Sequence, residues 1–134
     1  MHFIHPGEEA VFMPLYTEAR KLLTAHPDAQ QAIVLQSASQ KIYTVVSSHI
    51  CQGDHTEENA CLQRLQQNGN AQLLRLVALW QDGGTDVPSY AFRQALVALD
   101  PGNRQTQILM LSERGYHAMV LGATLPRASA KQLL

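Results

Sequence analysis

The chain has 134 residues, of which 46% are hydrophobic and 16% charged, and its formal net charge is −1. This length predicts a single domain over residues 1–134 that can bury a core. The near-neutral charge argues against nucleic acid as a partner, because phosphate binding needs a surplus of Lys and Arg. Apolar runs fall short of the ~20 residues of a membrane span, the first residues lack the pattern of a secretory signal, and two cysteines are too few for a disulfide framework. We therefore expect a cytoplasmic protein with no nucleic-acid or membrane partner.

Hydrophobic periodicity and turn residues predict alternating helices and strands. The predicted elements, in chain order, are a helix over 8–25, strands over 31–36 and 42–47, a helix over 55–67, a strand over 73–80, a helix over 88–99, strands over 107–111 and 117–121, and a helix over 128–134. The run 73–80 is apolar apart from Arg75, which is typical of a strand buried on both faces. This order predicts an α/β fold with the sheet in the middle of a three-layer sandwich.

One short motif stands at the start of the second predicted helix, where His55 and Glu57 are two residues apart. In zinc deaminases an H-x-E element supplies one zinc ligand and a glutamate that moves protons without binding the metal. Zinc is needed there because it lowers the pKa of its bound water towards ~7. The same two residues are equally typical of a solvated helix start, so the motif alone leaves both interpretations open.

Three segments together resemble the cytidine deaminase family. They are Ile42-Tyr43-Thr44 with His55-Thr56-Glu57-Glu58-Asn59-Ala60, then Val87-Pro88-Ser89-Tyr90-Ala91-Phe92-Arg93-Gln94-Ala95-Leu96, then Leu121-Gly122-Ala123-Thr124-Leu125-Pro126-Arg127-Ala128. They are similar to that family's C/H-A-E-R-N/T-A, S-P-C-G-x-C-R-Q-V-L and L-x-x-L-L-P-x-A segments. The resemblance implies an α/β/α sandwich with a mixed central sheet of about five strands, and a homo-dimer or tetramer.

The departures from the family pattern fall on the zinc site. The two cysteines that bind zinc in the family correspond to Ser89 and Phe92, and the arginine after the catalytic glutamate corresponds to Glu58. Of the three protein ligands that a catalytic zinc needs, only the His55 position remains. The resemblance therefore predicts a protein that has lost zinc-dependent deamination, binds no cofactor, and acts as a ligand-binding or assembly module.

The candidate ligand is a nucleoside-like small molecule. The family's pair of ribose-binding residues corresponds to Ser47 and His49 at the end of the second predicted strand. Ser89, beside Pro88 at a helix start, either caps that helix or donates a hydrogen bond to a ligand there. We expect Ser47, His49 and Ser89 to be the substrate-binding residues.

Two alternatives remain open from the sequence. One is an active nucleoside or base deaminase with a rearranged zinc site, in which His55 and Cys51 bind the metal, His49 assists and Glu57 moves the proton. The other is an interaction protein, such as an inhibitor or partner of an active deaminase. A bound metal ion would support the first alternative. Co-purification with a second chain would support the other.

Overall fold

The structure is a computed structural model that describes residues 2–3 and 8–126. The α-helices are α1 (Met13–Ala25), α2 (Thr56–Gln67) and α3 (Tyr90–Leu99), and short 3-10 helices are η1 (Glu8–Val11), η2 (Ile50–Gln52), η3 (Pro101–Gln105) and η4 (Leu121–Thr124). The strands are β1 (His2–Phe3), β2 (Gln31–Ser37), β3 (Ile42–Ser47), β4 (Leu73–Trp80), β5 (Thr85–Asp86), β6 (Gln107–Ser112) and β7 (Gly115–Val120). The helix predicted over 128–134 lies outside the described residues.

The strands form one mixed sheet in the order β1-β7-β6-β4-β2-β3, with β5 paired to β4. β4 and β6 run parallel, and the other pairs are antiparallel. β2 and β3, which correspond to the strands predicted over 31–36 and 42–47, form an antiparallel hairpin with Gln31 opposite Ser47. The five long strands confirm the predicted sheet of about five. The two-residue strands β1 and β5 escaped prediction because a period-2 pattern needs at least four residues to be recognised.

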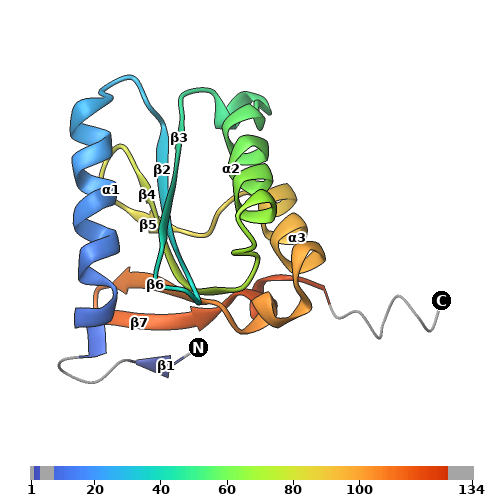
Figure 1. The fold of residues 1–134 in the computed structure, drawn as a ribbon. Helices are drawn as coiled ribbons and strands as arrows, with labels where there is room; N and C mark the ends of the chain where they lie inside the picture. The colour runs from blue at the N-terminus through green and yellow to red at the C-terminus, as the bar shows by residue number, and fades with distance from the viewer. Residues whose placement is uncertain (1, 4–7, 127–134) are drawn as a thin grey trace.

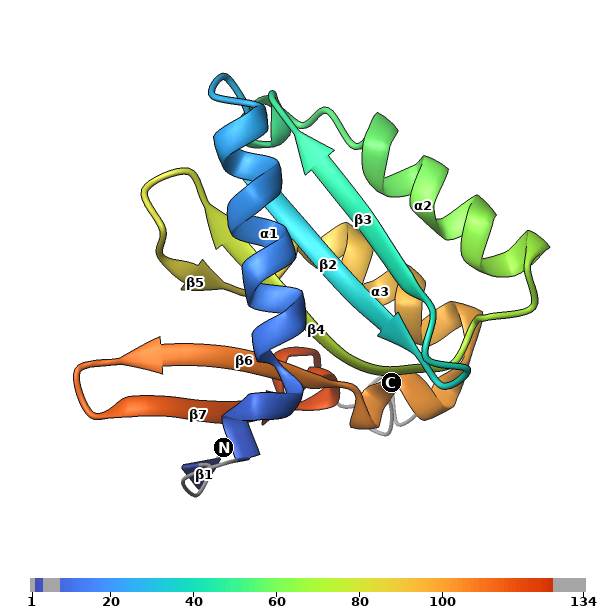
Figure 2. The same ribbon diagram turned by 60° about the vertical axis from the view of Figure 1, so that its left-hand side comes forward.

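The helices cover the two faces of the sheet unequally, and this confirms the three-layer sandwich. Figures 1 and 2 show α1 on one face and α2 with α3 on the other. Successive residues of β2 point to opposite faces, so Ile33 packs in the cluster under α2 and α3 while Val34 packs in the cluster under α1. The central strands are therefore apolar on both faces.

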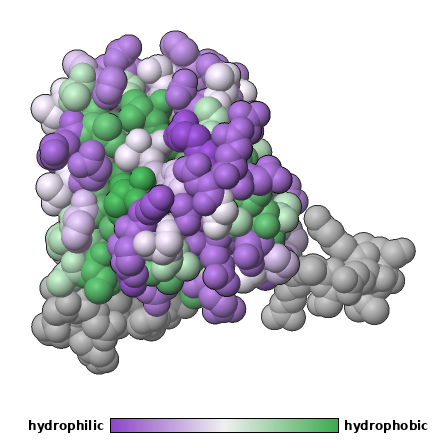
Figure 3. Space-filling model, viewed as in Figure 1, coloured by the Kyte–Doolittle hydropathy of each residue, from purple (hydrophilic) through white to green (hydrophobic). Residues whose placement is uncertain are grey.

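The surface follows from this layering. Hydrophilic residues cover much of the face seen in Figure 3, with hydrophobic residues in smaller patches between them. Within residues 2–3 and 8–126, each helix is too short or too polar to cross a bilayer.

Local capping fixes the two helix starts that form the candidate site. Asp54 Oδ1 accepts a hydrogen bond from the Thr56 N–H at 3.0 Å, and this bond is the main reason that the pKa of the Asp54 carboxyl is lowered. Ser89 is the N-cap of α3, since its Oγ accepts from the Phe92 N–H at 3.2 Å. The two helices start close together, because the side chain of Ser89 reaches Glu58 in the first turn of α2.

Candidate functional site

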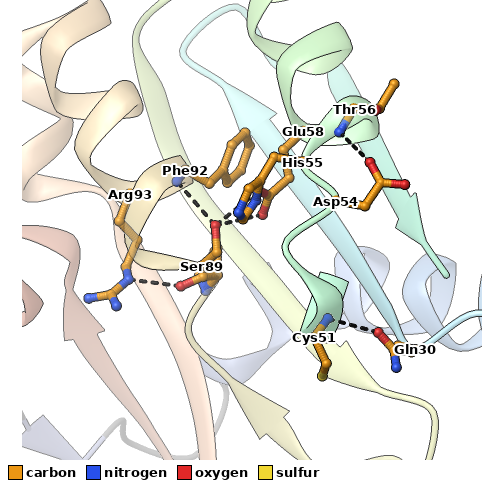
Figure 4. Close-up of polar contacts among 10 residues, drawn as sticks. Gln30, Cys51, Asp54, His55, Thr56, Glu58, Ser89, Phe92 and Arg93 are labelled. Atoms are coloured by element: carbon orange, nitrogen blue, oxygen red, sulfur yellow. Dashed lines mark hydrogen bonds and ion pairs between the residues drawn. The ribbon is translucent and has the colours of Figure 1, made fainter. Parts of the chain in front are cut away.

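Three polar side chains from the starts of α2 and α3 form one hydrogen-bonded cluster, which we call the 55–58–89 cluster. His55 Nδ1 donates to Glu58 Oε1 at 2.6 Å, and Ser89 Oγ donates to both oxygens of Glu58, at 2.9 and 3.0 Å. Figure 4 shows these side chains pointing toward one another. The Glu58 side chain is only 1% exposed and that of His55 is 35% exposed. A buried carboxylate needs such donors, because removing it from water without them is costly.

Helix geometry explains why Glu58 joins His55. Residues three apart lie on the same face of a helix, and Glu58 follows His55 by three. Glu57 is rotated away from that face and is exposed. The structure thus brings Glu58, rather than the predicted Glu57, to His55 and Ser89. Sequence reasoning missed this pair, and the i, i+3 spacing was the signal that could have found it.

The two positions that the resemblance assigns to zinc cysteines carry other chemistry here. The Ser89 hydroxyl is used in the bonds to Glu58 and to the Phe92 N–H. Phe92 is 1% exposed and packs in the core with Cys61 and Leu65, and its ring lies beside Glu58 in Figure 4. Burial raises the pKa of the Cys61 thiol to about 11, so this cysteine behaves as a core residue.

The residues predicted for a rearranged metal site are not brought together. Cys51 is exposed, and its N–H donates to Gln30 Oε1 at 3.0 Å. Figure 4 shows its side chain directed away from His55. His49 is exposed, and its carbonyl accepts the N–H of Asp54. Among the described residues, no three His, Cys, Asp or Glu side chains gather around one point that could hold a metal ion.

A pocket of about 280 Å³ lies beside Ser89. It is lined by the first residue of β2, by η2, by the end of β4 with β5, and by the start of α3. Its volume is just below the ~300–1,000 Å³ of typical small-molecule sites. Of the three predicted substrate-binding residues only Ser89 lines it, while Ser47 is buried in β3 and His49 is exposed outside it.

Three polar residues of the pocket besides Ser89 were missed by sequence reasoning. They are Gln31, Asp86 and Arg93. Gln31 is 2% exposed, and its Oε1 has no hydrogen-bond partner among the described residues. A glutamine at the start of an otherwise apolar strand was a usable signal, because buried polar groups are rarely left unpaired without reason.

Two charged side chains of the pocket are held in fixed positions. Asp86 accepts the Val87 N–H through Oδ1 and the indole N–H of Trp80 through Oδ2, both at 2.7 Å. Arg93 donates through Nε to the Pro88 carbonyl and through one Nη to the Thr124 carbonyl, both at 2.8 Å. In the described part of the chain the ion pairs are Lys21 with Glu18 and His55 with Glu58, so Asp86 and Arg93 do not neutralise each other.

Comparison with known proteins identifies the fold. No protein-family model matches the chain, and no curated protein matches its sequence. Among solved structures, the cytidine deaminase from Bacillus anthracis has a TM-score of 0.68 at 12% identity and covers 92% of each chain. The cytidine deaminase from Mycobacterium leprae has a TM-score of 0.61 at 14% identity, covering 87% of this chain and 98% of its own. The fold is cytidine deaminase-like.

The cytidine deaminase from Mycobacterium tuberculosis gives the same result, with a TM-score of 0.63 at 19% identity over 87% of this chain and 95% of its own. At this identity the structural similarity establishes the fold alone, and the activity has to be argued from the residues of the site. The zinc site that the resemblance implies needs three protein ligands. On this cytidine deaminase-like scaffold His55 has neither cysteine beside it, so the residues do not fit a zinc ion.

Proposed function

We propose that this chain is a cytidine deaminase-like protein that does not carry out zinc-dependent deamination and that binds a small molecule in the pocket beside Ser89. One observation carries the proposal. The donors and acceptors of the 55–58–89 cluster are used on one another, with Glu58 Oε1 accepting from both His55 and Ser89. The hydroxyl of Ser89, at a position that the resemblance assigns to zinc, therefore already has protein partners, and Phe92 at the other position has no donor atom.

The sign of the buried charge supports the same conclusion. The family pattern balances two zinc-binding thiolates with an arginine. Here the arginine position holds the buried carboxylate of Glu58, while the thiolate positions hold Ser89 and Phe92. These substitutions form a coherent set, because the hydroxyl and the imidazole supply the donors that a buried carboxylate needs.

Metal analysis and an activity assay test the proposal together. The protein is purified without chelators, its zinc is measured by mass spectrometry, and ammonia release is followed from cytidine, deoxycytidine, adenosine and guanine, with and without added Zn²⁺, Mn²⁺ and Fe²⁺. We expect far less than one zinc per chain and no ammonia above the buffer rate. One tightly bound zinc per chain, with ammonia release that Glu57→Gln abolishes, would overturn the proposal in favour of an active deaminase.

The Glu57→Gln and Glu58→Gln variants form a matched pair in this assay. Under the proposal Glu57→Gln is silent, because its side chain is exposed, whereas Glu58→Gln weakens folding through the buried cluster. A rearranged catalytic site at His55 and Glu57 predicts the opposite ranking for activity.

We further propose that the protein assembles as a homo-dimer or tetramer in the cytoplasm, as the resemblance implies. Light scattering on the eluting protein measures its mass. A strictly monomeric protein across the micromolar range would contradict the assembly role and leave the ligand-binding role standing.

A further inference from the structure

The pocket beside Ser89 is lined by a buried side chain, Gln31, whose Oε1 is satisfied by no described residue. Gln31 opens β2, between Ser47 of β3 and Trp80 of β4. Its side chain is 2% exposed, lines the pocket, and has no partner for Oε1 among the described residues. Its amide presents an acceptor and a donor side by side. A ligand with a hydrogen-bonding group satisfies this amide.

Two opposite charges also border this pocket without meeting each other. The Asp86 carboxylate is oriented by the Trp80 indole and the Val87 N–H. Each of its oxygens accepts one bond from the protein and keeps accepting capacity for another. Arg93 donates to two carbonyls and stacks over the Tyr90 ring at 5.7 Å. In residues 8–126 its remaining guanidinium hydrogens have no acceptor, and its charge has no carboxylate partner.

Asp86 and Arg93 are anchored on backbone groups of consecutive residues. Asp86 is anchored on the N–H of Val87, and Arg93 on the carbonyl of the next residue, Pro88. Consecutive residues advance the chain by at most ~3.6 Å each, so both anchors lie within the length of a small molecule. An anion alone would be repelled by Asp86, and a cation alone by Arg93. A molecule that carries both charges a few bonds apart satisfies the two together.

We propose that this pocket binds a small zwitterion of the amino-acid type, with its carboxylate on Arg93, its ammonium on Asp86, and Gln31 completing the hydrogen bonds. The proposal rests on the ligand-binding role proposed above and names the ligand class. The apolar walls formed by Ile50, Val87 and Pro88 suit a short aliphatic part. The modest pocket volume of about 280 Å³ suits a molecule of this size.

Calorimetric titration of the full chain tests the ligand class. The probes are glycine, L-alanine, L-proline, β-alanine and γ-aminobutyrate, which differ in charge separation, with acetate and ethylammonium as single-charge controls and cytidine as the nucleoside control. We expect at least one zwitterion to bind at least tenfold more tightly than acetate, ethylammonium and cytidine. Cytidine binding more tightly than every zwitterion would overturn the inference while leaving the ligand-binding role intact. Absence of binding by all the zwitterions also overturns it.

Variants of the pocket test the assignment of groups. Asp86→Asn keeps the shape of the side chain and Arg93→Gln shortens it, each removes one charge, and each should weaken zwitterion binding at least tenfold. Gln31→Leu should weaken binding without lowering the thermal midpoint, because it removes a buried carbonyl oxygen that has no partner among the described residues. A purely structural Gln31 would give the reverse result, with unchanged binding and a lower midpoint. Full binding by either charge variant would overturn the proposal even if the variant is less stable. Glu57→Gln is the matched control, since Glu57 lies outside the pocket, and it should bind as the parent does.

Discussion

The two sides of Ser89 differ in how their polar groups are used. On one side, in the 55–58–89 cluster, the buried carboxylate of Glu58 takes donors from His55 and Ser89. On the other side, no described residue pairs with Gln31 Oε1 or forms an ion pair with Asp86 or Arg93. A satisfied buried network rigidifies a fold, whereas a polar group left unpaired costs stability. This difference supports the structural role that we propose for the first region and the binding role that we propose for the second.

The comparison also explains how a cytidine deaminase-like fold can persist without metal. A zinc ion held by residues of α2 and α3 would join these helices covalently. Here Ser89 of α3 hydrogen-bonds Glu58 of α2, and the Phe92 ring fills the core beside it. Burying such a ring contributes ~1.5–3 kcal/mol, so under the proposed function packing and hydrogen bonding together link the two helices in place of a metal.

The sharpest way to break this comparison is to rebuild the metal site. The variant Glu58→Arg/Ser89→Cys/Phe92→Cys gives His55 two thiol neighbours and restores the family's balance of charge. Without metal we expect a loss of ~3–5 kcal/mol in unfolding free energy, mainly from truncating the buried Phe92 ring. With Zn²⁺ we expect one bound ion per chain and recovery of part of that loss, because metal binding stabilises only the folded state. Urea unfolding with and without zinc, and metal analysis after dialysis, measure both effects.

The control for this variant is Glu58→Arg/Ser89→Ala/Phe92→Ala, which makes the same truncations without thiols. It should be destabilised equally and should not respond to zinc. If the parent chain responds to zinc as strongly as the thiol variant does, the structural role of the 55–58–89 cluster is wrong.

Removing the donors of Glu58 has the next largest expected effect. The double variant His55→Ala/Ser89→Ala leaves a carboxylate that is 1% exposed without its two side-chain partners, and breaking a buried charged pair costs ~3–5 kcal/mol. Adding Glu58→Met should recover most of this loss, since an apolar side chain of similar volume needs no donors. Urea denaturation of the double and triple variants measures the difference, and equal stability of the two would contradict the role given to Glu58.

Much of the fold could be predicted from the sequence, because the periodicity of its hydrophobic residues indicates the long helices and strands. The apolar run of β4 and the β-branched run of β3 identified the central strands, and Pro88 with Ser89 marked the start of α3. The pairing of β4 with β6 in parallel could not be read from local pattern, because it depends on where the chain returns after α3. Short strands such as β5 are defined by their neighbours rather than by their own residues.

The candidate site was only partly predictable, for a different physical reason. The resemblance to a family motif favoured Glu57. Which glutamate points inward depends instead on which one shares a helix face with the buried residues. Glu58 lies on the face of α2 that carries Cys61 and Leu65, all three buried. Asp86 and Arg93 enter the pocket from β5 and α3, and only the folded chain shows that Gln31 of β2 lies with them.

Gln31 offers a smaller test of the second region. Gln31→Leu replaces an unpaired buried amide with an apolar side chain of similar length, and we expect the free energy of unfolding to rise by ~1–2 kcal/mol, since an unsatisfied buried polar group costs about that much. Ser47→Ala, at the buried position opposite on β3, is the matched control. Denaturant unfolding without ligand gives the value. A loss of stability on Gln31→Leu would mean that the protein itself satisfies this amide.

The smallest expected effect concerns the reactivity of the two cysteines, one of which lies in the core and the other at the pocket. Burial raises the pKa of Cys61 to about 11 from 9.0, whereas Cys51 is exposed at the pocket. Because the thiolate is the reactive form, a disulfide reagent at pH 8 should modify one thiol per native chain quickly, and Cys51→Ser should remove that fast phase. A fast phase that survives Cys51→Ser would show that the core around Cys61 opens readily.

The same shift has a consequence for stability with a definite sign. The folded state keeps the Cys61 proton at pH values where the unfolded state has released it, so this group's contribution to stability falls as the pH rises from about 9 to about 11. Cys61→Ala should flatten the decline in that range while lowering stability at neutral pH, because it leaves a cavity. Thermal unfolding between pH 8 and 11 compares the slopes. If the stability of parent and variant declined equally steeply with pH, the Cys61 thiol would be in contact with water. The interior face of α2 that carries Cys61 would then be open to solvent.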